Sequence, residues 1–197
     1  MNKSEFVFSI IIPVYNTEKY IEKCLNSVLD AMDTDCEVII VNDGATDNSE
    51  KIIKQFINNL PEKYKENFVY TKKKNKGLAD TKNVGIEMAR GKFISVVDSD
   101  DYIDKNFYKI AREYINNYDV IIYDLYVVFE NNPIYNYTSR AYREDKEIFL
   151  EGLLDGAMSG SSCNKIIKKE LYKDFKFPVG KQYEDVAVTP FILTNAK

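Results

Sequence analysis

The sequence of 197 residues contains no histidine. Histidine is the side chain that most often exchanges protons near neutral pH, and it is a common zinc ligand. Its absence excludes histidine general bases, Ser-His-Asp and Cys-His catalysis, and every histidine-ligated metal site. Acid–base chemistry in this chain therefore has to use other groups, and carboxylates are abundant, with 31 Asp and Glu residues.

Cysteine is scarce as well: only Cys24, Cys36 and Cys163 occur, and none forms a CxxC pair. An odd number without that spacing indicates neither a disulfide framework nor a thiolate zinc site. We expect each cysteine to be a small buried hydrophobic residue in a protein of a reducing compartment.

Glycine and proline number only 8 and 5, and 45% of the residues are hydrophobic. This composition excludes a disordered chain, and the length suffices for one sizeable core, so we expect a single domain over residues 1–197. The formal net charge of −4 argues against a dedicated nucleic-acid-binding protein, which needs clustered cations.

Long apolar runs are absent, since no stretch reaches the roughly 18 residues that a membrane-spanning helix needs. The N-terminal segment Met1–Val14 resembles a signal peptide only superficially, because Glu5 interrupts it and no small-residue cleavage site follows. We therefore expect a soluble, cytoplasmic protein.

The first half alternates strand-like and helix-like segments. Buried strands are predicted over residues 6–13, 36–41, 68–71 and 93–97, with amphipathic helices after each. Asp47 and Glu50 have the spacing of a capping box, Gly91 stands where a left-handed residue would stop the third helix, and Asp104 opens a helix extending to Tyr118. This order predicts an α/β fold with a Rossmann-like, mainly parallel central sheet and helices on both faces.

The second half has shorter, aromatic-rich segments over residues 120–123, 125–129 and 135–138, typical of a mixed or antiparallel extension of the sheet. We further expect a short helix over residues 147–154, an edge strand over 162–167 and a helix from Glu184.

Parallel strands deliver the residues after their carboxyl ends to one edge of the sheet, where ligands of open α/β sheets bind. Here that edge receives Tyr15, Asp43 and the cluster Asp98–Asp101. In an extended segment Asp98 and Asp100 would project to the same side, and two close carboxylates favour a hard divalent cation between them. With few other ligands nearby, Mg²⁺ or Mn²⁺ would need water and a diphosphate to complete its shell. The alternative is an acidic turn that caps the next helix.

Five blocks of this sequence resemble, in order and spacing, the motifs of family 2 glycosyltransferases, which are inverting enzymes of the GT-A (nucleotide-diphospho-sugar transferase) fold. The blocks are Pro13–Asn16, Asn42–Ser49, Asn75–Gly85, Gly91–Asp101 and Tyr183–Asp185.

The resemblance implies a donor site and a base. Tyr15, with Pro13 before it, would lie against the nucleobase, and Asp43 would accept a hydrogen bond from uracil, which favours UDP-sugars. Asp98, with Ser99 beside it, would address the ribose or diphosphate, and Asp100 would ligate Mn²⁺ or Mg²⁺. Asp185 matches the general base that activates an acceptor hydroxyl.

Two departures from the family pattern stand out. Lys82 occupies a position where the family usually has arginine, which keeps the charge but loses the planar fork for base or phosphate. The chain also ends soon after Asp185, whereas family members commonly continue. We therefore expect either a truncated protein or a minimal catalytic domain, with a nucleotide-sugar-binding half (1–101) and an apparently truncated acceptor-side half (102–197).

The sequence thus predicts an inverting hexosyl- or N-acetylhexosaminyltransferase that extends a cell-surface saccharide or glycolipid. The alternatives are a nucleotidyltransferase, although Pro13–Asn16 lacks the glycine-rich phosphate loop of that class, and a donor-binding module without transfer activity. The basic run Lys72–Lys74 with Lys76 could attract the anionic inner face of a membrane, a peripheral association, but is more typical of a solvated loop.

Overall fold

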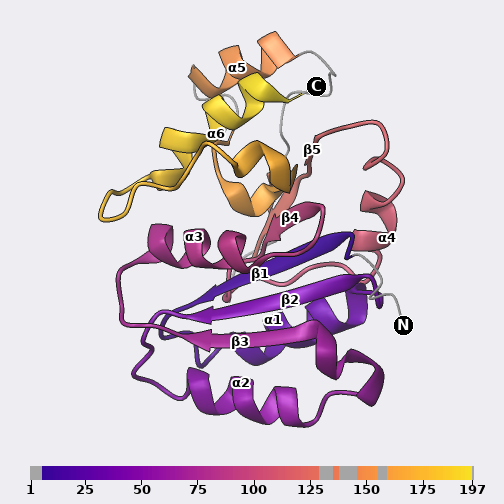
Figure 1. Ribbon diagram of the computed structural model, residues 1–197, viewed down its shortest axis with the longest axis vertical. Coiled ribbons are helices and arrows are strands. Elements are labelled where there is room, and N and C mark those ends of the chain that lie inside the picture. The colour runs from indigo at the N-terminus through magenta and orange to yellow at the C-terminus, as the bar shows by residue number, and fades with distance from the viewer. Residues whose placement is uncertain (1–5, 129–134, 138–145, 155–158, 197) are drawn as a thin grey trace.

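A computed structural model describes residues 6–128, 135–137, 146–154 and 159–196. The chain folds into one six-stranded sheet with helices on both faces, plus a separate two-stranded sheet (Figure 1). In chain order the elements are β1 (Phe8–Val14), α1 (Ile21–Ala31), β2 (Cys36–Asn42), α2 (Ser49–Asn58), β3 (Phe68–Lys72), α3 (Leu78–Met88), β4 (Phe93–Val96), α4 (Phe107–Ala111), β5 (Val120–Ile122), β6 (Leu125–Val127), β7 (Tyr135–Tyr137), α5 (Lys146–Leu154), β8 (Lys165–Lys168) and α6 (Glu184–Asn195).

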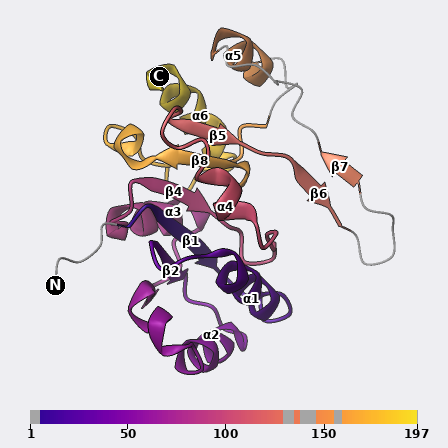
Figure 2. The same ribbon diagram turned by 90° about the vertical axis from the view of Figure 1, so that its right-hand side faces the viewer.

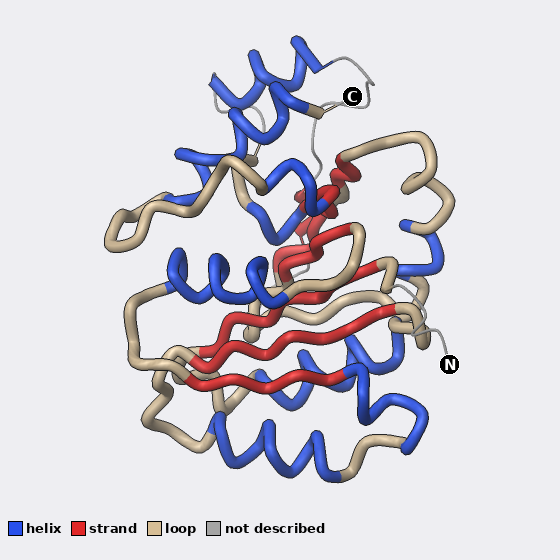
Figure 3. The backbone as a smooth tube through the Cα atoms, viewed as in Figure 1, coloured by secondary structure: helices blue, strands red, loops and turns tan. Residues whose placement is uncertain are grey.

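The sheet has the order β3-β2-β1-β4-β8-β5, and its first four strands are parallel. The two seven-residue strands β1 and β2 are buried along their whole length, as expected for strands covered on both faces. Successive side chains of β1 point to opposite faces of the sheet and pack into two separate hydrophobic clusters. Ile10 and Ile12 face the layer of α1 and α2, whereas Ile11 faces α3 and α6. The predicted α/β architecture is confirmed, and the two layers lie on opposite sides of the sheet in Figure 3.

The antiparallel extension differs in detail from the expectation. The predicted edge strand is β8, which lies between β4 and β5 and is antiparallel to both. Its residues Ile166 and Ile167 are buried, since strands flank them on either side. Among the described strands, β6 and β7 pair only with each other, and they project away from the main sheet (Figure 2). Of the three aromatic-rich segments expected to extend the sheet, only the first therefore contributes a strand, β5, to the main sheet among the described residues.

Three local predictions were wrong. Asp47 does not form a capping box with Glu50: its carboxylate accepts from the Ser49 amide at 3.0 Å, and Glu50 pairs with Lys54 and Lys72. The helix predicted from Asp104 to Tyr118 is regular only over α4 and continues as turns.

The third wrong prediction concerns Gly91, whose φ is not positive, so it does not adopt a left-handed conformation. It is needed for space: an added Cβ would lie 2.7 Å from the backbone of Phe8 and Ser9. Its amide donates to Ser9 Oγ at 2.8 Å and to Glu37, a fully buried carboxylate that also accepts from Arg90 Nε at 2.8 Å. This network fixes the sheet at the end opposite to the candidate site.

No helix of the described residues is both long and apolar enough to cross a bilayer.

Candidate active site

The tips of β1 and β2 form the first wall of the candidate site. Val14 and Asn42 are in register, and the Asp43 amide donates to Val14 O at 2.8 Å, so the residues after the two strands start side by side. Tyr15 follows β1 directly and is 49% exposed. Pro13 is buried in β1, and it lies past the stretch of β1 that pairs with β4, so its missing N–H leaves no ladder bond unmade.

The turn after β1 is tied to the loop after β2. Asn16, in a left-handed conformation with φ of 52°, accepts from the Thr46 amide at 2.8 Å. Asparagine tolerates this conformation better than most residues do. The bond holds the two loops together at the edge that carries Tyr15.

Asp43 is nearly fully buried, and its carboxylate is fixed by the main chain before α3. The amides of Lys76 and Gly77 donate to its two oxygens at 2.9 and 2.8 Å, and Lys73 Nζ forms an ion pair with it. Gly77 has a φ of +90°, which favours glycine. The carboxylate is thus held in one orientation with acceptor capacity remaining on Oδ2.

Two lysines of the basic run before α3 form ion pairs with carboxylates of this protein. Lys73 bridges Asp43 and Asp80, the latter at 2.7 Å, and Lys72 pairs with Glu50. Lys74 and Lys76 are exposed.

The acidic segment after β4 is a turn, because the Asp101 amide donates to Asp98 O at 3.0 Å. The extended geometry expected for Asp98 and Asp100 is therefore replaced by one that brings residues i and i+3 together. One ligand atom each of Asp98, Asp101 and Cys163 lies within 4.8 Å of the others. Asp100 is exposed beside this group, and Ser99 is buried.

The Asp98 carboxyl occupies an unusual electrostatic environment. Burial, together with the charges of Asp101 and Asp100, raises its pKa to about 6, although the Lys82 ammonium opposes the shift. Burial and Asp100 likewise raise the pKa of Asp101. A divalent cation would remove this repulsion, and oxygen ligands are those that Mg²⁺ and Mn²⁺ prefer, so the residues present fit such an ion.

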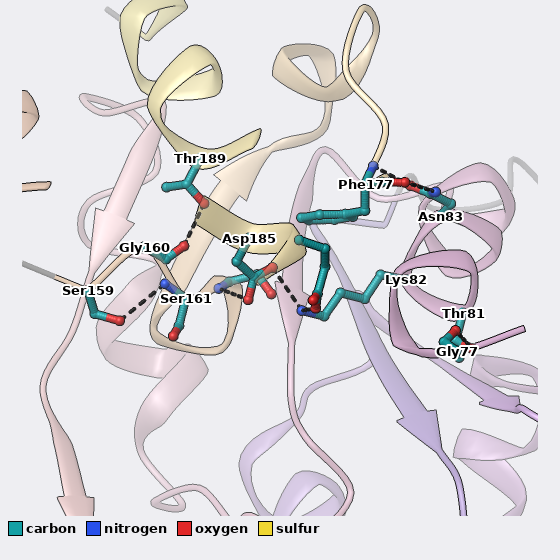
Figure 4. Close-up of polar contacts among 12 residues, drawn as sticks. Gly77, Thr81, Lys82, Asn83, Ser159, Gly160, Ser161, Phe177, Asp185 and Thr189 are labelled. Carbon is teal, nitrogen blue, oxygen red and sulfur yellow. Dashed lines mark hydrogen bonds and ion pairs between the residues drawn. The ribbon is translucent and has the colours of Figure 1, made fainter. Parts of the chain in front are cut away.

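Lys82 of α3 lies at the centre of the site. It is 2% exposed, and its Nζ contacts Glu184 Oε1 at 2.9 Å and Asp185 Oδ1 at 2.8 Å (Figure 4). Burial alone would lower the pKa of Lys82, but the charges and hydrogen bonds of Asp185 and Glu184 outweigh it and raise that pKa. The lysine therefore stays charged and joins α3 to the start of α6.

The Asp185 carboxylate is held from two sides. Its Oδ1 faces Lys82, and its Oδ2 accepts from the Ser162 amide at 3.1 Å. Tyr183, at the N-cap of α6, is 79% exposed and has a φ of 58°. The chain thus turns sharply before α6 and presents Glu184 and Asp185 in the first turn of the helix, where the helix dipole favours negative charge.

The structure brings together residues from distant parts of the chain. Asp43 and Asp98 come after β2 and β4, at the carboxyl edge of the sheet. Lys82 contacts Asp185 at 2.8 Å and interacts with Asp98, so these three residues lie together at that edge. This edge therefore carries a lysine ammonium group and several carboxylates, and the exposed Tyr15 follows β1 at the same edge. This is an arrangement that can bind a nucleotide and move a proton.

Sequence reasoning missed several residues of the site. Lys73 and Ser162 contact the carboxylates of Asp43 and Asp185, but from the sequence Lys73 was only part of a basic run and Ser162 had no assigned role. Asp101 lay within the acidic cluster but was given no role of its own. Lys165 was given no role either, yet it is 1% exposed, and burial lowers its pKa to about 8. A lysine within a predicted strand was the available signal.

Comparison with known proteins agrees with this geometry. Residues 9–175 match the family described as glycosyl transferase family 2. EpsH of Bacillus subtilis is 32% identical over 184 residues, which cover 90% of this chain and 52% of EpsH.

A crystal structure of residues 1–349 of Staphylococcus aureus TarS superimposes with a TM-score of 0.81 at 30% identity, covering 98% of this chain and 56% of that chain. Another structure of TarS 1–349, in complex with UDP-GlcNAc, has a TM-score of 0.79 at 28% identity, covering 98% and 54%. TarS is a poly(ribitol-phosphate) β-N-acetylglucosaminyltransferase.

The chain spans about half the length of EpsH and of the TarS structures that it matches. The family match nevertheless covers most of its residues, and the sheet order and the TarS superposition confirm the GT-A fold. The chain therefore belongs to glycosyltransferase family 2.

Proposed function

We propose that this chain transfers a sugar from a UDP-sugar to a hydroxyl of a saccharide or glycolipid acceptor, with inversion at the anomeric carbon. The observation that carries the proposal is the contact of Lys82 with Asp185 at 2.8 Å. It brings a carboxylate of α6 to the edge of the sheet where Asp43 and Asp98 lie. A nucleotide site and a candidate base then adjoin each other.

The donor would bind along the tips of β1, β2 and β4. Tyr15 would stack on uracil, with Pro13 in the strand beneath it. The uracil imide N–H would donate a hydrogen bond to Asp43 Oδ2, which can accept a second bond. Main-chain amides fix that carboxylate, so it needs no reorganisation. The complex of TarS with UDP-GlcNAc supports a UDP-sugar of the hexosyl or N-acetylhexosaminyl type.

The diphosphate would lie near the second pair of donor residues. Asp98 and Ser99 would face the ribose or diphosphate, and Lys82 would add a positive charge on the same side. The interaction of Lys82 with Asp98 supports this placement.

The acidic turn after β4 would hold Mn²⁺ or Mg²⁺. We assign Asp100 as a ligand from its place in the family pattern, and the convergence of Asp98 and Asp101 supports a site for a cation at this turn. When bound, such an ion neutralises charge that develops on the leaving diphosphate.

Asp185 would act as the general base. Its carboxylate would take the proton of the acceptor hydroxyl while that oxygen attacks the anomeric carbon from the face opposite to the nucleotide, and the sugar–phosphate bond breaks in the same displacement. A positioned base of this kind contributes about 10²–10⁴-fold to a rate. Lys82 and the Ser162 amide would orient the carboxylate.

The wider setting is also a proposal. Residues 1–101 would form the donor half and 102–197 the acceptor-side half. The free thiols of Cys24, Cys36 and Cys163 fit a cytoplasmic location. A peripheral contact with the inner face of the membrane would use the exposed Lys74 and Lys76, and the acceptor would belong to cell-surface polysaccharide synthesis.

A screen of nucleotide sugars that scores release of the nucleoside diphosphate, with Mn²⁺ present, tests this proposal. We expect release of UDP from one or a few UDP-sugars and loss of that release in EDTA. Stabilisation by a nucleoside triphosphate, with no release from any nucleotide sugar, would contradict the proposal and favour a nucleotidyltransferase.

A further inference from the structure

A second buried lysine lies behind the proposed base and has no part in the mechanism above. Lys165 of β8 is 1% exposed. Its Nζ donates to Ser159 O at 2.7 Å, Ser161 O at 2.8 Å and Asn164 Oδ1 at 2.6 Å. Three acceptors from one short segment thus converge on a single ammonium group, which has three protons to donate.

The segment that Lys165 holds is also the segment that touches the base. The Ser162 amide donates to Asp185 Oδ2 at 3.1 Å, and Gly160 O accepts from Thr189 Oγ1, one helical turn further along α6, at 2.6 Å. Figure 4 shows this loop lying against the start of α6. The loop therefore lies between Lys165 on one side and Asp185 on the other.

We propose that Lys165 is a positioning residue for the transfer reaction: by fixing the carbonyls of residues 159–161, it holds the Ser162 N–H against Asp185 and so sets the direction of the base. The inference rests on the proposed function of Asp185.

The Lys165 ammonium group is needed in this position because its removal would leave three hydrogen-bond acceptors without a donor. Methionine has a similar length but no donor, so two part-buried carbonyl oxygens and the buried amide oxygen of Asn164 would lose their partner. Unpaired buried acceptors are costly, and the loop would rearrange to pair them. A displacement of about 1 Å at a reacting group can lower a rate about 100-fold.

The contact that Lys165 supports can be removed separately. Ser162 is the first residue of a short 3-10 helix, and Ser161 before it has an extended conformation with ψ of 142°. Proline is compatible with such a position, because the N–H of a first helical residue makes no bond within the helix and because proline favours an extended residue before it. The Ser162 hydroxyl has no hydrogen-bond partner among the described residues, so Ser162→Pro removes no side-chain bond and deletes the amide donor.

The experiment compares Lys165→Met and Ser162→Pro with Lys168→Met as the matched control. Lys168 lies on the same strand, is 41% exposed at its side chain and pairs with Asp119, away from the loop. Transfer is measured with the UDP-sugar found in the screen, UDP binding by calorimetry with Mn²⁺, and folding by thermal unfolding.

We expect kcat to fall about 10- to 100-fold in Lys165→Met and in Ser162→Pro, with the donor KM and UDP affinity within about twofold of wild type. Lys168→Met should behave as wild type. In an Asp185→Asn background neither variant should lower the residual rate further, because both act through the same carboxylate.

Wild-type kcat in a folded Lys165→Met or in Ser162→Pro, or a further loss in the Asp185→Asn background, would overturn the inference. If Lys165→Met does not fold, the result for Ser162→Pro decides. A wild-type protein that turns over no nucleotide sugar would overturn the proposed function as well, which distinguishes the two failures.

Discussion

The two halves of the molecule are held together in different ways. Before Asp101, long strands such as β1 and β2 are buried from end to end, and Asp43 is fixed by main-chain amides. After Asp101, β5 has three half-buried residues, and polar contacts such as that of the Ser162 amide with Asp185 join the loop before β8 to α6.

This difference has a consequence for the site. The residues assigned to donor binding follow the ends of the central strands. The proposed base, Asp185, lies on α6, and its carboxylate is oriented by Lys82 and by the Ser162 amide of a loop. We therefore expect the first half to determine binding of the nucleotide and the second half to determine transfer.

The largest expected effect is on the base itself. Asp185→Asn should lower kcat for transfer about 1,000-fold, because the amide cannot accept the acceptor's proton. UDP affinity should stay close to that of wild type, since the donor residues are untouched and Lys82 keeps Glu184 as a partner. Steady-state kinetics and calorimetry measure the two quantities.

Asp174→Asn makes the same chemical change at an exposed carboxylate and should be silent. Normal transfer by Asp185→Asn would show that the second half does not supply the base.

A second prediction compares the packing of the two halves. Leu25 on α1 is fully buried in the main core, whereas Leu193 on α6 belongs to a small cluster with partly buried neighbours. Leu25→Ala should lower the free energy of unfolding by about 3–4 kcal/mol and Leu193→Ala by about 2 kcal/mol, because a tightly surrounded site cannot close around the cavity. Urea denaturation of both variants measures this, and equal losses would remove the contrast in packing.

A third prediction concerns pH and the metal-free protein. The pKa of Asp98 is raised from 3.8 to about 6, mainly by burial. Between these values the folded state binds the proton more tightly than the unfolded state, so the contribution of Asp98 to stability is largest at low pH and is lost as pH rises through 6.

Asp98→Asn removes this dependence. In EDTA, the stability of the variant relative to wild type should rise by roughly 2 kcal/mol between pH 4 and pH 7. Asp30→Asn, at an exposed position of α1, is the control. A constant difference between Asp98→Asn and wild type across this range would show that burial does not govern Asp98.

The smallest effect is expected at the nucleobase. Tyr15→Ala should weaken UDP binding about tenfold, since a stacked base contributes about 1–3 kcal/mol, and should leave kcat unchanged at saturating donor. Tyr126→Ala removes a ring that is 70% exposed on β6 and serves as control. A fall in kcat of Tyr15→Ala without a change in its UDP affinity would contradict the expectation that the first half determines nucleotide binding.

The sequence predicted the elements whose signals are local. Alternating strands and helices fixed the positions of β1 to β4, and the rule for parallel strands placed Tyr15, Asp43 and Asp98 at one edge. The helix expected from Glu184 is α6, whose first turn carries Asp185.

Other features could not be read locally. β8 was expected at an edge, but a buried central strand and an edge strand of four residues have the same pattern. The contact of Lys82 with Asp185 joins residues 103 positions apart, which no pattern in either segment encodes. The turn at Asp98–Asp101 replaced an extended segment, because a hydrogen bond within the acidic run determines its shape.

The central claim is that residues of both halves form one site for a UDP-sugar at the carboxyl edge of the sheet. A crystal structure of the protein with UDP and Mn²⁺ tests it most directly. We predict uracil between Tyr15 and Asp43, the ion at the acidic turn after β4 and the diphosphate on the side of Lys82. UDP bound at any other surface, with this edge empty, would contradict the account.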